Sequence, residues 1–69
     1  MRISARNILK GKVVGIEAGA VNMEVSVAIA PGVEMTSIIT KKSAADLGLA
    51  VGKQVYVLVK ASNVMIGVE

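Results

Sequence analysis

Apolar and polar residues alternate through the middle of the chain, which predicts a mostly β protein. From Val21 to Ala30, in V-N-M-E-V-S-V-A-I-A, every second residue is a large apolar one. This period of two is typical of a strand that buries one face. The pair Pro31-Gly32 predicts a turn, and the stretch after it predicts the return strand of a hairpin over Val33–Thr40. The apolar face of the first of these strands holds Val21, Met23, Val25, Val27 and Ile29.

The stretch upstream of this hairpin predicts an earlier strand over Ile8–Glu17, because it is rich in Val and Ile. Gly11 and Gly15 interrupt it. Glycine inside a strand marks a bulge or a close approach of another backbone. The tripeptide A-G-A after Glu17 supplies the turn into the next strand.

A short helix is predicted between the hairpin and the next strand. Thr40 has the chemistry of a helix N-cap for K-K-S-A-A-D-L, residues 41–47. Gly48 follows that stretch and is suited to close the helix at its C-terminal end.

Two further strands are predicted after the turn at Val51–Lys53, over Gln54–Lys60 and over Val64–Val68. The first of these is apolar on both faces, so one face is expected to meet the core and the other a neighbouring chain. Five strands with one short helix between the third and fourth predict an all-β fold, a small five-stranded Greek-key barrel of the OB type. The whole of residues 1–69 is expected to form a single domain.

The composition favours self-association over a lone monomer. The chain has only 69 residues, of which 54% are hydrophobic and 19% charged. A domain of this size buries only about 60% of the surface that its unfolded chain exposes. With no Cys and no His, it has neither disulfides nor a structural zinc site to compensate. A homo-oligomer is therefore expected, with a monomer of unusually apolar surface as the alternative.

The residues that are missing exclude most catalytic chemistry. Without His or Cys, the usual general base, thiol nucleophile and soft-metal ligands are absent. The five acidic residues are scattered, so neither a carboxylate pair nor a cation site is expected. The single aromatic residue, Tyr56, lies in an apolar strand and offers no stacking platform for single-stranded nucleic acid. We therefore expect that the protein is not an enzyme and that it does not bind nucleic acid.

The net charge favours an anionic ligand. The sequence shows no membrane-spanning segment and no signal peptide. The net charge is +3, from basic residues that are spread along the chain. No apolar run approaches the roughly 18 residues that suggest a membrane span, and the N-terminus lacks the apolar region of a signal peptide. Together with the absence of Cys, this predicts a cytoplasmic protein without membrane contact.

Hydrogen-bond donors recur beside basic residues near both ends of the chain. They are Ser4, Arg6 and Asn7 at one end and Lys60, Ser62 and Asn63 at the other. If the two stretches lie together, their guanidinium, ammonium and hydroxyl groups suit a small oxyanion. The alternative is that these residues only begin a strand, form a turn and end a strand in solvent.

The same two stretches carry a resemblance to a known family. S-A-R-N-I-L-K-G-K-V, residues 4–13, resembles the opening signature of the molbindin (Mop) family, and K-A-S-N-V-M-I-G, residues 60–67, resembles its closing signature. L-G-L-x-x-G-K, residues 47–53, and S-I-I-T also fit, so the resemblance covers essentially the whole chain. Ile8 departs from the pattern, since many relatives have a polar residue there.

The resemblance implies a small cytoplasmic protein with an OB-like barrel that binds molybdate, and often tungstate, without an organic cofactor. It implies a hexamer, built as a trimer of dimers, with the anion held between subunits for intracellular storage or homeostasis. The residues that match the main site are Ser4, Ala5, Arg6, Lys60, Ala61 and Ser62, the last three contributed across an interface. Those that match a second, backbone-lined site are Gly19, Ala20, Val21, Asn22, Ser37 and Ile38. An OB module that binds nucleic acid and a purely structural oligomerisation domain are the alternatives.

Overall fold

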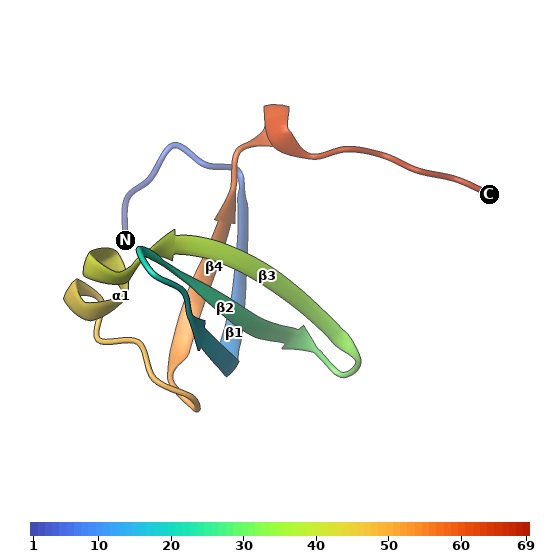
Figure 1. Ribbon diagram of the computed structural model, residues 1–69. Coiled ribbons are helices and arrows are strands. Elements are labelled where there is room, and N and C mark those ends of the chain that lie inside the picture. The colour runs from blue at the N-terminus through green and yellow to red at the C-terminus, as the bar shows by residue number, and fades with distance from the viewer.

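The computed structural model describes residues 1–69 and shows a curled antiparallel sheet with one short helix (Figure 1). The chain forms the elements β1 (Asn7–Ala18), β2 (Asn22–Ala30), β3 (Val33–Thr40), α1 (Lys41–Asp46), β4 (Gln54–Val59) and the 3-10 turn η1 (Ala61–Asn63). The predicted hairpin of β2 and β3 is confirmed. Gly32 has a φ of +73° at its tip, a conformation that glycine adopts without steric cost.

The strand order is that of a Greek key. The strands lie in the order β3-β2-β1-β4, and every neighbouring pair is antiparallel. Three strands follow one another as a meander, and β4 returns through α1 to lie beside β1. This arrangement confirms the predicted mostly β, OB-like class.

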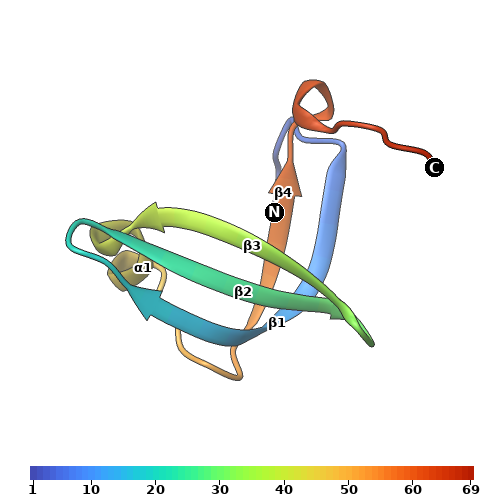
Figure 2. The same cartoon turned by 45° about the vertical axis from the view of Figure 1, so that its right-hand side comes forward.

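Strand β1 bends the sheet, because its two halves pair with different strands. Its first half pairs with β4 from Asn7 to Lys12, and its second half pairs with β2 from Lys12 to Ala18. The register shifts between Val13 and Gly15, which confirms the predicted irregularity at Gly15. A bulge increases local twist and bends the strand, and Figure 2 shows β1 turning sharply between its two partners.

The core is small and lies inside this curl. Only Val13, Val25, Val27 and Ala44 are buried, 4 of the 69 residues. Met23 and Ile29 pack against this cluster from the predicted apolar face of β2, as do Val55 and Val57 from β4. Val21 was predicted on the same face, but it lies outside the strand and is 70% exposed.

The outer face of β4 has no cover within the chain. Val55, Val57 and Val59 are half-buried, whereas Tyr56 and Leu58 on the other face are 53% and 38% exposed. The prediction that one face of this strand meets the core is confirmed. A neighbouring chain as the cover of the other face stays a prediction.

Helix α1 begins at its predicted cap. The Thr40 side chain accepts a hydrogen bond from the backbone N–H of Ser43 at 3.0 Å. The helix ends at Asp46 with Leu47 as its C-cap, one residue earlier than predicted, and Gly48 follows with a φ of +63°. A left-handed residue after the cap is a common helix ending.

We expect Thr40→Ala to lower the free energy of unfolding by about 1 kcal/mol, because it removes the acceptor of an otherwise unpaired helix amide. Thr40→Ser keeps a hydroxyl oxygen at the same position and should stay close to wild type. Urea denaturation at one fixed protein concentration measures both variants. Equal losses in the two variants would contradict the capping role.

The prediction of a fifth strand over Val64–Val68 is wrong for the single chain. Beyond η1, the only backbone hydrogen bond is Val64 N–H to Ala61 O at 3.3 Å, and the segment runs away from the sheet (Figure 1). Its composition suits a strand, but η1 directs it away from the edges with which it could pair. Lys60 also lies outside β4, which ends at Val59. The sheet therefore has four strands, and within one chain it does not close into a barrel.

Candidate functional site

The two donor-rich stretches meet at one end of the β1–β4 pair. Ser4–Arg6 lead into β1, and Lys60–Ser62 follow β4. The register pairs Asn7 with Val59, and the Asn7 side-chain Nδ2 donates to the Val59 carbonyl oxygen at 3.2 Å. Arg6 and Lys60 therefore flank a directly paired position.

This juxtaposition bears on one expectation from the sequence. The resemblance places Lys60–Ser62 across a subunit interface from Ser4–Arg6. The antiparallel register brings the two stretches to the same end of the sheet within one chain, and a contribution across an interface stays a prediction. Figure 1 shows the segment before β1 and the turn after β4 at the same end of the sheet.

The polar groups at this end are free to bind a ligand. Apart from Asn7, none of the side-chain hydrogen bonds in the chain involves this region, so Ser4, Arg6, Lys60 and Ser62 have no partner. The backbone amides of Ser4, Ala5 and Arg6 likewise make no backbone hydrogen bond. Ala5 is half-buried, and the other matched residues are exposed.

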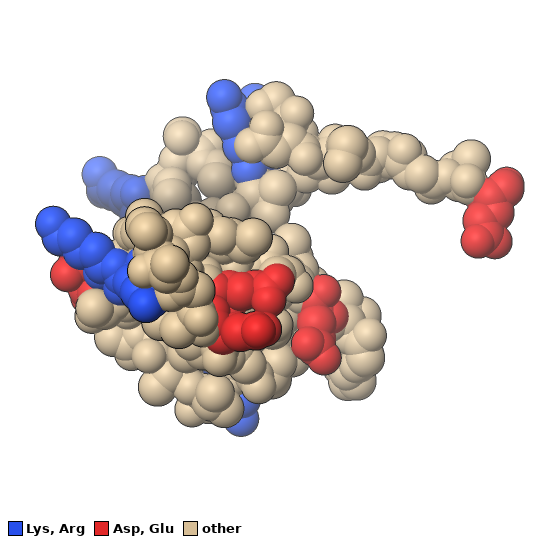
Figure 3. Space-filling model, viewed as in Figure 1, with Lys and Arg blue, Asp and Glu red and all other residues tan.

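Each of the free side chains can donate a hydrogen bond. The guanidinium of Arg6 and the ammonium of Lys60 donate only, and the hydroxyls of Ser4 and Ser62 turn their protons toward an acceptor. Figure 3 shows Lys and Arg side chains beside η1, whereas Asp and Glu side chains lie over the sheet and at the C-terminus. This arrangement can hold a small anion that accepts several hydrogen bonds.

Four residues of the second predicted site, Gly19, Ala20, Val21 and Asn22, lie in and beside the turn between β1 and β2. The turn between β1 and β2 is closed by Gly19 N–H to Asn22 O at 2.8 Å, so the amide of Gly19 is already used. The amides of Ala20 and Val21 have no acceptor in the chain. They are the free donors of this turn.

Ser37 and Ile38, the other half of that second site, lie on the edge strand β3. They pair with Val25 and Glu24, whereas Asn22 pairs with Thr40 beyond them. The turn and this pair therefore lie near the same end of the β2–β3 hairpin, offset along it.

The L-G-L-x-x-G-K stretch is structural. The Lys53 ammonium donates to the carbonyl oxygens of Leu47 and Gly48 at 2.6 and 3.2 Å, at the end of the helix. Gly52, like Gly48, has a positive φ, of 96°. Lys53 is therefore engaged in holding the α1–β4 connection and is not a free basic group.

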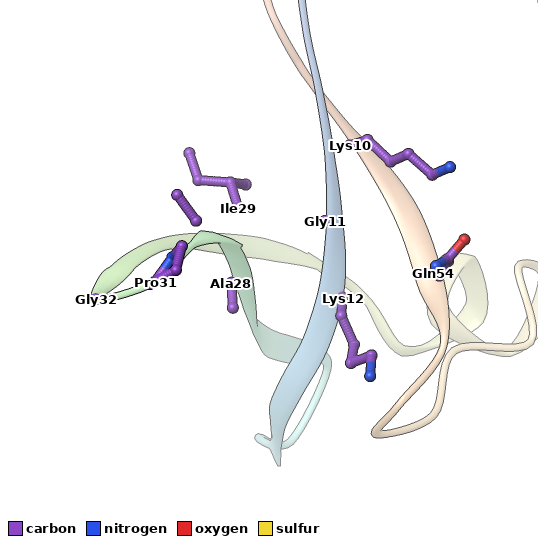
Figure 4. A pocket seen from close by; sticks show the side chains of 9 residues that line it. Lys10, Gly11, Lys12, Ala28, Ile29, Pro31, Gly32 and Gln54 are labelled. Atoms are coloured by element: carbon purple, nitrogen blue, oxygen red, sulfur yellow. The ribbon is translucent and has the colours of Figure 1, made fainter.

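One basic surface was missed by the sequence analysis. Lys10 and Lys12 lie on one face of β1, and Gln54 pairs with Lys12 (Figure 4). They border an open hollow of about 470 Å³ that reaches the Pro31-Gly32 turn. The K-G-K spacing was the available signal, since residues two apart on a strand share a face. The Lys side chains extend into solvent in different directions, so no site is assigned here.

Neither a cluster of metal-binding side chains nor a membrane-spanning helix is found in the structure. No group of three or more His, Cys, Asp or Glu side chains could hold a metal ion. No helix is long and apolar enough to cross a membrane.

Comparison with known proteins identifies relatives of the same length. A family model described as the TOBE domain matches residues 3–66. A probable molybdenum-pterin-binding protein of Haemophilus influenzae is 49% identical over 69 residues, which is 100% of both chains.

Solved structures agree in fold. MopII from Clostridium pasteurianum superposes with a TM-score of 0.90 at 48% identity, covering 97% of this chain and 100% of that one. The cytoplasmic molybdate-binding protein ModG, solved with molybdate bound, has a TM-score of 0.94 at 52% identity, and this chain spans 49% of its length. The sequence signatures, the fold and the full-length match to such relatives together show that the chain belongs to the TOBE-domain proteins of the molbindin (Mop) type.

Proposed function

We propose that this protein binds molybdate reversibly as a free oxyanion and performs no catalysis. The observation that carries the proposal is that two stretches rich in unpartnered donors lie at the same end of the β1–β4 pair, where Arg6 and Lys60 flank the paired residues Asn7 and Val59. Support comes from the relatives, because ModG, 52% identical to this chain, was solved with molybdate bound.

A site rich in donors suits this anion for a chemical reason. Molybdate near neutral pH is a tetrahedral dianion without a proton, so it accepts hydrogen bonds and donates none. A protonated phosphate must also donate its own O–H, and among the four side chains only the hydroxyls of Ser4 and Ser62 could accept it. Tungstate has the same charge and shape and is proposed as a second ligand. The charges of Arg6 and Lys60 together balance the dianion, and hydrogen bonds without a covalent step leave binding reversible.

The exposure of the site supports a shared location between subunits. Arg6, Lys60 and Ser62 are all exposed in the single chain, so an anion held there would keep much of its hydration. Charge-assisted hydrogen bonds gain strength when water is excluded. A second copy that covers this end would supply that exclusion. We propose a hexamer arranged as a trimer of dimers, in which residues 1–69 act as one module.

The physiological role that follows is storage and homeostasis of molybdenum in the cytoplasm. A reversible site without catalytic groups holds the anion and releases it when the free concentration falls. The turn amides of Ala20 and Val21, with Ser37 and Ile38 nearby, are proposed as part of a second set of sites.

Calorimetric titration of the purified protein with molybdate, tungstate and sulfate tests this function. We expect saturable binding of molybdate and tungstate. Sulfate has the same charge and shape but is smaller, so its titration measures how far the site selects by size. Single-stranded RNA is the matched comparison, because Tyr56 is exposed beside its strand partner Lys10. Binding of RNA without binding of molybdate would overturn the proposal in favour of a nucleic-acid module.

A further inference from the structure

A polar residue interrupts the inward, largely apolar face of the β1–β4 pair. Side chains alternate between the two faces of a strand, so Asn7 shares its face with the buried Val13. On the paired strand, Val55, Val57 and Val59 are half-buried on the same face. Asn7 is itself half-buried. A side-chain amide in such a place costs free energy unless it is hydrogen-bonded, so its presence there calls for a reason.

The Asn7 side chain makes the one side-chain hydrogen bond that joins the two donor-rich stretches. Its Nδ2 donates to the Val59 carbonyl oxygen at 3.2 Å, between residues 52 positions apart. The other side-chain hydrogen bonds of the chain lie around α1 and the connection from α1 to β4. Val59 is the last residue of β4, and Lys60 follows it directly. The bond therefore lies where the chain leaves the sheet and enters the candidate site.

The turn η1, which follows this bond, is not otherwise tied to the sheet by hydrogen bonds. Lys60 is its N-cap, and no side chain caps it. Its backbone bonds, Asn63 N–H to Lys60 O at 2.8 Å and Val64 N–H to Ala61 O at 3.3 Å, stay within the turn. Residues 61–63 are all exposed. A short segment with exposed hydrogen bonds and little packing opens easily, so the position of η1 depends on how the end of β4 is held.

We propose that Asn7 is a positioning residue, whose side-chain amide holds the end of β4 against the start of β1. This hydrogen bond, here called the Asn7 latch, fixes Lys60 and Ser62 relative to Ser4–Arg6. Asn7 acts through the turn and not by contact with the anion. Donors that are already in place bind more tightly, because a loop and its side chains that become ordered only on binding cost affinity. The effect on affinity rests on the proposed function, whereas the latch itself does not.

Asn7→Leu tests this role, because it keeps a side chain of similar size and removes the donor. The neighbours on this face are apolar, so urea denaturation should show a folded state at least as stable as that of the wild type. Molybdate binding, measured by calorimetric titration, should weaken about three- to tenfold, the range expected for a neutral hydrogen bond. A fall in stability would show that Asn7 serves the fold, and would overturn the positioning role.

Asn7→Gln is the conservative variant, since it keeps an amide donor on a longer side chain. It should retain more affinity for molybdate than Asn7→Leu. Equal losses in the two variants would contradict the hydrogen bond as the cause.

A double-mutant cycle distinguishes positioning from direct contact with the anion. If Asn7 acts through the turn, Asn7→Leu should weaken binding by only about twofold or less when Lys60 is already alanine. With Arg2→Ala it should keep its full effect, because Arg2 lies outside both stretches. Equal losses in the Lys60→Ala and Arg2→Ala backgrounds would reject positioning.

Amide hydrogen exchange, followed by NMR without molybdate, tests the latch itself. In Asn7→Leu, the Asn63 N–H, which donates to Lys60 O, should exchange at least about fivefold faster than in the wild type. The control is the Gly19 N–H, which is bonded to Asn22 O at the other end of β1 and should exchange within about twofold of its wild-type rate. An unchanged Asn63 amide would overturn the latch whether or not the protein binds molybdate.

The exchange and titration measurements together separate this inference from the proposed function. Faster exchange at Asn63 in a protein that binds no molybdate rejects only the proposed function. Molybdate binding in the wild type with an unchanged Asn63 amide in Asn7→Leu rejects only the latch. Faster exchange with unchanged molybdate affinity rejects the positioning role, because the turn would then move without consequence for the ligand.

Discussion

Arg6→Ala is expected to weaken molybdate binding about 10- to 100-fold. A hydrogen bond to a charged group contributes about 1.5–3 kcal/mol, and about 1.4 kcal/mol corresponds to a factor of ten in affinity. Arg6 stands immediately before the Asn7–Val59 pair and has no partner of its own in the chain. Lys60→Ala, immediately after the paired strand β4, should produce a loss of the same order. Calorimetric titration with molybdate measures both.

Arg2→Ala is the matched control for this effect. It removes the same charge from an exposed residue that lies outside the S-A-R-N stretch. If net charge alone attracted the anion, Arg2→Ala and Arg6→Ala would weaken binding equally, and the assignment of the site would be wrong. Ultracentrifugation of each variant should show that the oligomer stays assembled, so that the loss is one of ligand contacts.

Gly11→Ala is expected to lower the free energy of unfolding by about 2–3 kcal/mol, a typical effect of overpacking a core. A Cβ at this position would lie 2.6 Å from Cγ1 of Val27 and 2.7 Å from the carbonyl oxygen of Ala28. Neither neighbour can yield easily, because Val27 is buried and the oxygen belongs to the backbone of β2. In a domain of this size, each kcal/mol shifts Tm by about 4–8 °C.

Gly15→Ala is the control in the same strand. Its added Cβ would meet the Ser26 Cβ at 3.7 Å, an ordinary contact distance. Thermal unfolding of both variants at one protein concentration makes the comparison, since the proposed assembly would make Tm depend on concentration. A Gly15 variant as unstable as the Gly11 variant would show that the cost comes from glycine's backbone freedom and not from the close approach of β2.

Local structure could be predicted from the sequence where a short pattern decides it. The alternation over β2, the turn at Gly32 and the cap at Thr40 each depend on residues close together in the chain, and each is confirmed. Gly11 and Gly15 were recognised as unusual positions for the same reason.

The error at Val64–Val68 has a physical cause. Strand propensity describes how a segment fits a pleated surface, but a strand exists only where an edge is available to pair with it. The chain has two such edges, and η1 leads the segment away from both. The sequence pattern therefore identified the segment correctly as strand-like, while its partner could not be predicted from local residues.

The residues of the candidate site could be named from the sequence, whereas their proximity depends on the folded chain. The chemistry of Arg6 and Lys60 can be read in the sequence. Their proximity depends on the β1–β4 register, which joins residues more than fifty positions apart through Asn7 and Val59. The hydrogen bonds from the Lys53 ammonium to the carbonyl oxygens of Leu47 and Gly48 could not be predicted from the sequence either, because they depend on how the connection between α1 and β4 folds.

Native mass spectrometry of the wild-type protein with molybdate tests the central claim most directly, since it counts chains and bound anions in the same particle. We predict hexamers that carry molybdate and lose it on dilution into molybdate-free buffer, with an Arg6→Ala hexamer that carries less. Monomers that bind molybdate as well as the assembled protein, or hexamers that bind none, would contradict the account.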